Sequence, residues 1–213
     1  MKLDRSLLRY IAFVCMVLDH IAITLLPSGP LAFSLRIVGR IAFPVFCYFL
    51  VQGFIYTHSR KRYALRLLGL ALLSQVPYTF CFLSVKLNVV FNLLAGLLLL
   101  SFLDHVSEAR PRHLVFLFAS LSLASLSEYG QMGIVVITTM YVMRENRPYW
   151  YLFLTPVLFL MSVEYCGAAI LALPLIACCS NEKGIELSRS FNYLFYPIHL
   201  AVFWFLQLAL PLV

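Results

Sequence analysis

The sequence predicts an all-α, polytopic bundle of transmembrane helices with about nine spans. Of the 213 residues, 62% are hydrophobic and 12% are charged, whereas a soluble domain carries about a quarter charged residues. The mean hydropathy is +0.92, and apolar runs alternate with short polar segments along the whole chain. So much apolar surface needs lipid around it, so we predict a single transmembrane domain over residues 1–213, embedded in the lipid bilayer.

The expected spans follow from the apolar runs and the breaks between them. Pro27-Ser28-Gly29-Pro30, for example, ends the first run because these residues favour a turn. Several spans are shorter than the ~20 residues that a perpendicular helix needs, so we expect spans five to eight to be tilted, broken or partly re-entrant. The nine ranges are 7–26, 33–58, 65–83, 89–103, 114–126, 131–143, 149–163, 168–179 and 191–210.

The basic residues orient the chain. The positive-inside rule places the N-terminus in the cytoplasm, because 13 of the 16 lysines and arginines then lie at cytoplasmic ends of spans. Lys86 is left on the outer side, and Arg36 and Arg40 alone fall in the outer half of the bilayer. The net charge of +7 therefore encodes orientation, and we expect no nucleic-acid partner.

No sequence pattern indicates a metal centre or a phosphate-binding glycine loop, and we expect no metal. The cysteines lie in or beside apolar segments and form no C-x-x-C pair, so we interpret them as small apolar residues. They are Cys15, Cys47, Cys81, Cys166, Cys178 and Cys179.

Arg36 and Arg40 lie four residues apart and share one helix face. Arginine at the bilayer centre costs from about 2.5 to more than 10 kcal/mol, so this pair needs a partner. With a rise of about 1.5 Å per residue, His20 and Arg40 both lie roughly 10 Å below the outer surface. Asp19 and His20 diverge by about 100° on a helix. We therefore expect one of them to pair with an arginine while the other faces a cavity.

Two interpretations of this cluster remain open from the residues alone. In the catalytic one, His20 acts as general base and an arginine neutralises a developing oxyanion or holds a phosphate. In the structural one, Asp19 and an arginine form a buried pair that fixes helix packing, and His20 is simply hydrogen-bonded.

Other polar residues also allow both a functional and a structural interpretation. Glu128, at an outer span end, joins the cluster or caps a helix near the headgroups. A lone histidine such as His199 is more often a packing residue. The basic segment 59–66, with Arg60, Lys61, Arg62 and Arg66, anchors the chain on anionic lipid or docks a polyanionic cofactor.

Several stretches together resemble the TraX family of polytopic bacterial membrane proteins, named for the enzyme that N-acetylates conjugative pilin. They occur in the family's order from residue 18 to residue 200. The most specific are Leu18-Asp19-His20-Ile21, Leu35-Arg36-Ile37-Val38-Gly39-Arg40-Ile41-Ala42-Phe43-Pro44, Val51-Gln52-Gly53-Phe54 and Phe195-Tyr196-Pro197-Ile198-His199-Leu200.

The resemblance implies an acetyltransferase of the bacterial cytoplasmic (inner) membrane. It would move an acetyl group from acetyl-CoA to an amine or hydroxyl acceptor, such as a pilin N-terminus or an envelope glycan or lipid. The resemblance implies site roles for His20, Arg36, Arg40, Tyr196 and His199. Together with the polar residues discussed above, we expect catalytic roles for His20, Asp19 and Arg40, and substrate binding by Arg36, Gln52, Glu128, Tyr196 and His199. Because acetyl-CoA is cytoplasmic, we expect its phosphates to bind Arg60, Lys61, Arg62 and Arg66.

Two other functions stay as alternatives. One is a proton-coupled small-solute transporter or flippase gated by the Asp19 cluster, although the hydropathy shows no inverted repeat. The other is a non-catalytic assembly factor of a pilus or conjugation system. Under this second alternative, Gln52 and Gln75 mark lost catalysis, because the family often has glutamate at both positions.

Overall fold

The computed structural model describes residues 3–105, 111–146, 148–180, 182, 184–185 and 188–210. Within these ranges the regular secondary structure is helical, and the β-type pairing consists of two isolated bridges, Leu3 with Cys179 and Leu87 with Ser127. The predicted all-α class is therefore confirmed. All six cysteines are free thiols.

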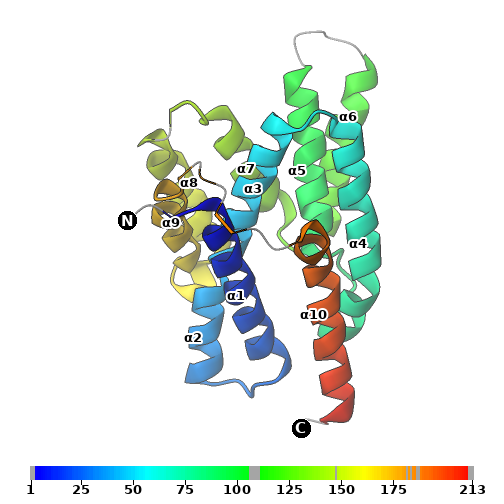
Figure 1. Ribbon diagram of the computed structural model, residues 1–213, viewed down its shortest axis with the longest axis vertical. Coiled ribbons are helices and arrows are strands. Elements are labelled where there is room, and N and C mark those ends of the chain that lie inside the picture. The colour runs from blue at the N-terminus through cyan, green and yellow to red at the C-terminus, as the bar shows by residue number, and fades with distance from the viewer. Residues whose placement is uncertain are drawn as a thin grey trace.

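The elements, in chain order, are α1 (Arg5–Thr24), α2 (Pro30–Gly39), α3 (Ala42–Tyr56), α4 (Arg60–Phe82), α5 (Val89–Asp104), α6 (Pro111–Leu126), α7 (Gly130–Val142), α8 (Pro148–Met161), the 3₁₀ segments η2 (Val163–Tyr165) and η3 (Ala168–Leu171), α9 (Ala172–Ala177) and α10 (Arg189–Ala209). They lie side by side in one bundle (Figure 1). Below, the end that carries the start of α1 is called the inner end, following the predicted orientation.

Length and composition make this bundle a membrane protein. In the described part of the chain, four helical segments are long and apolar enough to cross a membrane: Arg5–Thr24, Pro30–Tyr56, Arg60–Phe82 and Phe191–Ala209. The remaining apolar helices are 10–17 residues long, which agrees with the expectation that spans five to eight are short. Large apolar side chains such as Leu72, Val76 and Phe80 on α4 are exposed, as a lipid-facing surface requires.

The predicted span 33–58 is two helices rather than one. Arg40 and Ile41 form a turn between α2 and α3. Pro44 explains the break, because a proline has no N–H to donate to the carbonyl four residues earlier, here that of Arg40, and its ring collides with that carbonyl. The turn places Arg40 where two helices meet.

Two further boundaries differ from the sequence prediction or refine it. The basic segment 59–66, expected as a loop, is helical from Arg60 onward, because Ser59 caps the helix and its Oγ accepts a hydrogen bond from the Arg62 N–H at 3.3 Å. The predicted span 168–179 is broken, as expected, into the short segments η3 and α9.

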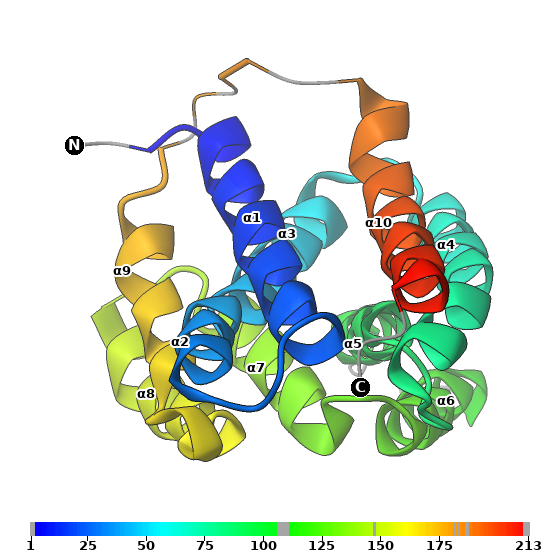
Figure 2. The same cartoon turned by 90° about the horizontal axis from the view of Figure 1, so that it is seen from below.

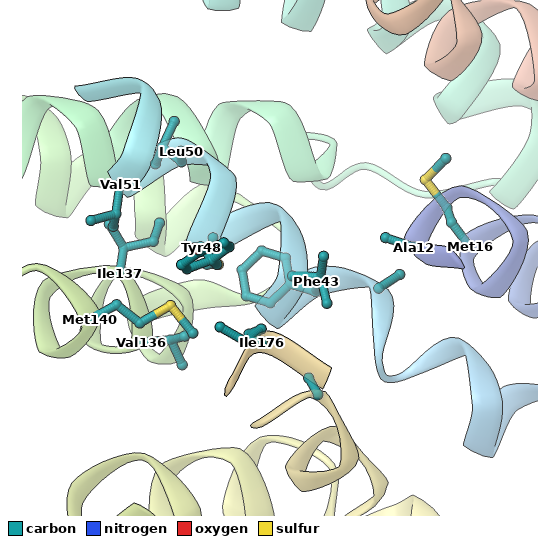
Figure 3. Close-up of a cluster of buried hydrophobic side chains, with 14 of the residues drawn as sticks. Ala12, Met16, Phe43, Tyr48, Leu50, Val51, Val136, Ile137, Met140 and Ile176 are labelled. Carbon is teal, nitrogen blue, oxygen red and sulfur yellow. The ribbon is translucent and has the colours of Figure 1, made fainter. Parts of the chain in front are cut away.

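The core lies around α3, which packs against α1, α5, α7 and α9 (Figure 2). Apolar side chains from four of these helices meet there (Figure 3): Ala12 and Met16 from α1, Phe43, Tyr48, Leu50 and Val51 from α3, Val136, Ile137 and Met140 from α7, and Ile176 from α9. Lipid is as apolar as this core, so close packing rather than water exclusion holds the helices together. Fully buried alanines such as Ala12, Ala71 and Ala172 permit that close approach.

Candidate functional site in the outer half of the bundle

The expected buried ion pair joins α1 to the turn between α2 and α3. Arg40 Nη2 donates a hydrogen bond to Asp19 Oδ1 at 2.5 Å, and Arg36 Nε lies 3.7 Å from the same oxygen. The side chains of Asp19 and Arg40 are 11% and 12% exposed, whereas that of Arg36 is 31% exposed. Two arginines therefore share one carboxylate, and the more exposed of them has no hydrogen bond from its Nε.

Gly39 makes this pairing possible. A Cβ atom at Gly39 would lie 2.7 Å from Asp19 Oδ1 and 2.8 Å from Asp19 Cγ. Such contacts are shorter than van der Waals distance, so only glycine lets the end of α2 approach the carboxylate on α1 this closely.

Tyr165, which the sequence analysis did not single out, completes the arginine environment. The guanidinium carbons of Arg36 and Arg40 lie 4.7 and 4.9 Å from the centroid of its ring, which is cation–π distance. Glu128, in the loop between α6 and α7, lies close enough to Arg40 and Asp19 to interact electrostatically with both.

His20 faces away from Asp19 and toward α10, as the 100° divergence requires. Its Nδ1 lies 2.8 Å from Nε2 of His199, and the two rings are parallel within 3° with centroids 5.0 Å apart. The Phe82 ring packs edge-on against the His20 ring at 5.0 Å. The residues brought together here are 179 positions apart in the chain.

The hydrogen-bond network assigns the protons of this histidine pair. His199 Nδ1 lies 2.8 Å from the carbonyl oxygen of Phe195, and because a carbonyl only accepts, that Nδ1 carries the proton. In a neutral ring Nε2 of His199 is then the acceptor, so His20 Nδ1 donates to it. The remaining nitrogen of His20, Nε2, keeps its lone pair and can accept a proton.

The aromatic rings beside this pair form a continuous stack toward the inner end. The Phe13 and Phe195 rings stack at 4.5 Å, and the Phe195 and His199 rings stack at 5.3 Å. Tyr196 is buried, and its ring lies 5.5 Å from that of His199. The structure therefore brings His199 to His20, while Tyr196 reaches this pair only through its contact with His199.

Gln52 does not join this group. It lies on α3 twelve residues beyond Arg40, roughly 18 Å along the helix axis, and lines a cavity of about 500 Å³ at the inner end, between α1, α3, α4 and α10.

Of the four basic residues expected to bind acetyl-CoA, only Arg66 lines this inner cavity. Arg60 instead forms an ion pair with Asp104, while Lys61 and Arg62 are exposed. The cavity contains two arginines that sequence reasoning assigned to orientation alone, Arg5 and Arg9. Among the described residues, no group of three or more His, Cys, Asp or Glu side chains is arranged to hold a metal ion.

Comparison with known proteins identifies the family of this chain. The family model described as "TraX protein" matches residues 4–207. The chain belongs to the TraX family. A relative from Dichelobacter nodosus, "Probable fimbrial assembly protein FimC, serogroup H1", is 28% identical to it over an alignment that covers 92% of each protein. No solved structure matches. The TraX match includes both the arginine–histidine group and the inner cavity.

Proposed function

We propose that this TraX-family chain is an acetyltransferase of the bacterial cytoplasmic membrane, which moves an acetyl group from acetyl-CoA to an amine or hydroxyl with His20 as general base. The observation that carries the proposal is the hydrogen-bond chain from the Phe195 carbonyl through His199 to His20. This chain fixes the tautomer of His20 and leaves Nε2 as an acceptor on a partly buried ring, within electrostatic range of Arg36 and Arg40.

In this reaction the acceptor N–H or O–H loses its proton to His20 Nε2 as it attacks the thioester carbonyl. The charge that develops on the carbonyl oxygen is stabilised by the guanidinium groups of Arg36 and Arg40. When the carbon–sulfur bond breaks, the leaving thiolate takes the proton from His20. His199 orients the base, because its Nε2 holds the His20 Nδ1–H.

The acceptor is inferred from the relative. That protein is named for fimbrial assembly, so we propose a pilus subunit, or another envelope molecule exposed at the outer half of the bundle. Arg36 suits acceptor binding, since it is the more exposed arginine of the pair.

The proposal is tested by incubating isolated membranes with radiolabelled acetyl-CoA and following label in protein, glycan and lipid fractions. The variant His20→Ala is compared with His58→Ala, which removes an exposed histidine outside the site. We expect His20→Ala to lower transfer by about 10²- to 10⁴-fold, the usual contribution of a general base, and His58→Ala to retain it. A folded His20→Ala protein with full transfer would overturn the mechanism.

The printed name of the relative also favours a second candidate, a non-catalytic assembly factor. This candidate predicts no label transfer by the wild-type protein and normal pilus assembly by His20→Ala. The same experiment therefore separates the two functions.

A further inference from the structure

The inner cavity has the charge and size of a binding site. It is lined by Arg5, Arg9 and Arg66, and its lining residues include no aspartate or glutamate. Its volume of about 500 Å³ lies within the range of roughly 300–1,000 Å³ that is typical of small-molecule pockets. Arg9 and Arg66 bring two positive charges into a lining without an acidic residue, which favours an anionic occupant.

Aromatic rings hold these arginines in place. The guanidinium carbon of Arg9 lies 5.1 Å from the Phe49 ring centroid, and that of Arg66 lies 5.8 Å from the Tyr63 ring centroid. In the described part of the chain, neither Arg9 nor Arg66 forms a hydrogen bond or an ion pair. A ring covers one face of a guanidinium and leaves its edge, where the N–H donors are, to another partner. A phosphate matches those donors in geometry and charge.

A second polar group in the lining lacks a hydrogen-bond donor. Asn192, on α10, has a buried side-chain oxygen with no hydrogen-bond partner. A phosphate oxygen cannot satisfy an acceptor, so the occupant also carries an N–H or O–H group.

The position of the cavity relates it to the histidine pair. Arg5, Arg9, Phe13 and His20 lie on one face of α1, and Phe13 lines the cavity. His20 follows Phe13 by seven residues, which is two helical turns or roughly 10 Å. The arginines therefore lie at the inner end of the cavity, and the apolar rings lie on the side that leads toward the proposed base.

We propose that the inner cavity binds the phosphate-bearing head of an acyl compound through Arg9 and Arg66. We assign the cavity to the acyl donor, whose phosphates and amide groups it would hold, and this assignment rests on the proposed acyl transfer. The binding of a phosphate in the cavity does not depend on that activity. An anionic phospholipid of the inner leaflet has the same head chemistry, and the experiment distinguishes the two sources.

The full-length protein, purified in detergent, is titrated with coenzyme A, which carries the phosphates but has no acetyl group to transfer. Arg9→Gln and Arg66→Gln each remove one guanidinium from the cavity. The matched control is Arg144→Gln, which removes an inner-end arginine paired with Glu145 outside the cavity. We expect Arg9→Gln and Arg66→Gln to weaken binding by about ten- to a hundredfold, the loss expected for a charged hydrogen bond, and Arg144→Gln to leave it within twofold.

A second arm uses nanodiscs made with or without phosphatidylglycerol, with thermal stability as the readout. If coenzyme A does not bind, but phosphatidylglycerol stabilises the wild type and not Arg9→Gln, the phosphate site stands and its donor role is overturned. If neither probe distinguishes Arg9→Gln from Arg144→Gln, the phosphate site itself is overturned. His20→Ala is expected to bind coenzyme A like the wild type, so a failure of the catalytic proposal leaves this result intact.

Discussion

Replacing Gly39 by alanine places a methyl group between the end of α2 and the Asp19 side chain on α1. In an ordinary helix position this substitution stabilises a protein by roughly 0.5–1 kcal/mol, because alanine has less backbone freedom to lose. At Gly39 the added carbon would lie 2.7 Å from Asp19 Oδ1 and 2.8 Å from Cγ. Either α2 moves away from α1, or Asp19 turns away from Arg40.

Both responses cost free energy. Overpacking of this kind costs typically about 1–3 kcal/mol, and breaking a buried ion pair outright costs about 3–5 kcal/mol. Since the Asp19–Arg40 hydrogen bond can lengthen before it breaks, we expect Gly39→Ala to lower the free energy of unfolding by about 1–3 kcal/mol. The sign is therefore opposite to that of a helix position with space around it.

The chain supplies such a position for comparison. Gly69 lies inside α4, and nothing lies within 4 Å of a Cβ built there. The measurement is unfolding of the purified proteins by titration with SDS, followed by circular dichroism at 222 nm. Gly69→Ala is expected to be neutral or more stable, and Gly39→Ala less stable. Equal or increased stability of Gly39→Ala would refute the close α1–α2 contact.

Three further outcomes are expected. Arg60→Gln should change the free energy of unfolding by at most about 1 kcal/mol in the same titration, because its partner Asp104 is 32% exposed and such pairs contribute little; a larger loss would show that this pair matters for folding. If the chain transfers acetyl groups as proposed, Tyr165→Leu should lower this transfer by more than Tyr165→Phe, which keeps the ring over both arginines; equal effects would exclude a cation–π role. Asn88→Ala should destabilise the protein by about 1–3 kcal/mol, because the buried Asn88 side chain donates to the Ala71 carbonyl at 2.8 Å and caps α5; unchanged stability would contradict that assignment.

The sequence predicted those features that depend on local chemistry or on short connections. Apolar runs located the helices, and a five-residue connection forced α1 and α2 to be neighbours. The depths of His20 and Arg40 were therefore enough to predict that Asp19 or His20 pairs with an arginine, but not which of the two does. The break at Arg40–Ile41 was also encoded, in Pro44, but the apolar run around it concealed the signal.

Contacts between distant helices were not predictable in the same way. A period identifies which face of α10 carries His199, but it does not say that this face meets His20 across 179 residues. Tyr165 lies in a 3₁₀ segment of three residues, which has no period at all. Arg5 and Arg9 were counted only as orientation charges, because the positive-inside rule gives the side of the membrane and not the partner.

The ring stack of Phe13, Phe195, His199 and His20 affects how ions can move along the bundle. It separates an arginine-lined cavity at one end of the bundle from a buried ion cluster in the other half. A continuous path of water through these groups would let protons flow across a membrane and dissipate its proton gradient. Moving an ion from water into apolar surroundings costs several kcal/mol, and the two phenylalanines offer it no hydrogen bond. The two phenylalanine rings thus place an apolar layer between the arginines of the cavity and the histidine pair.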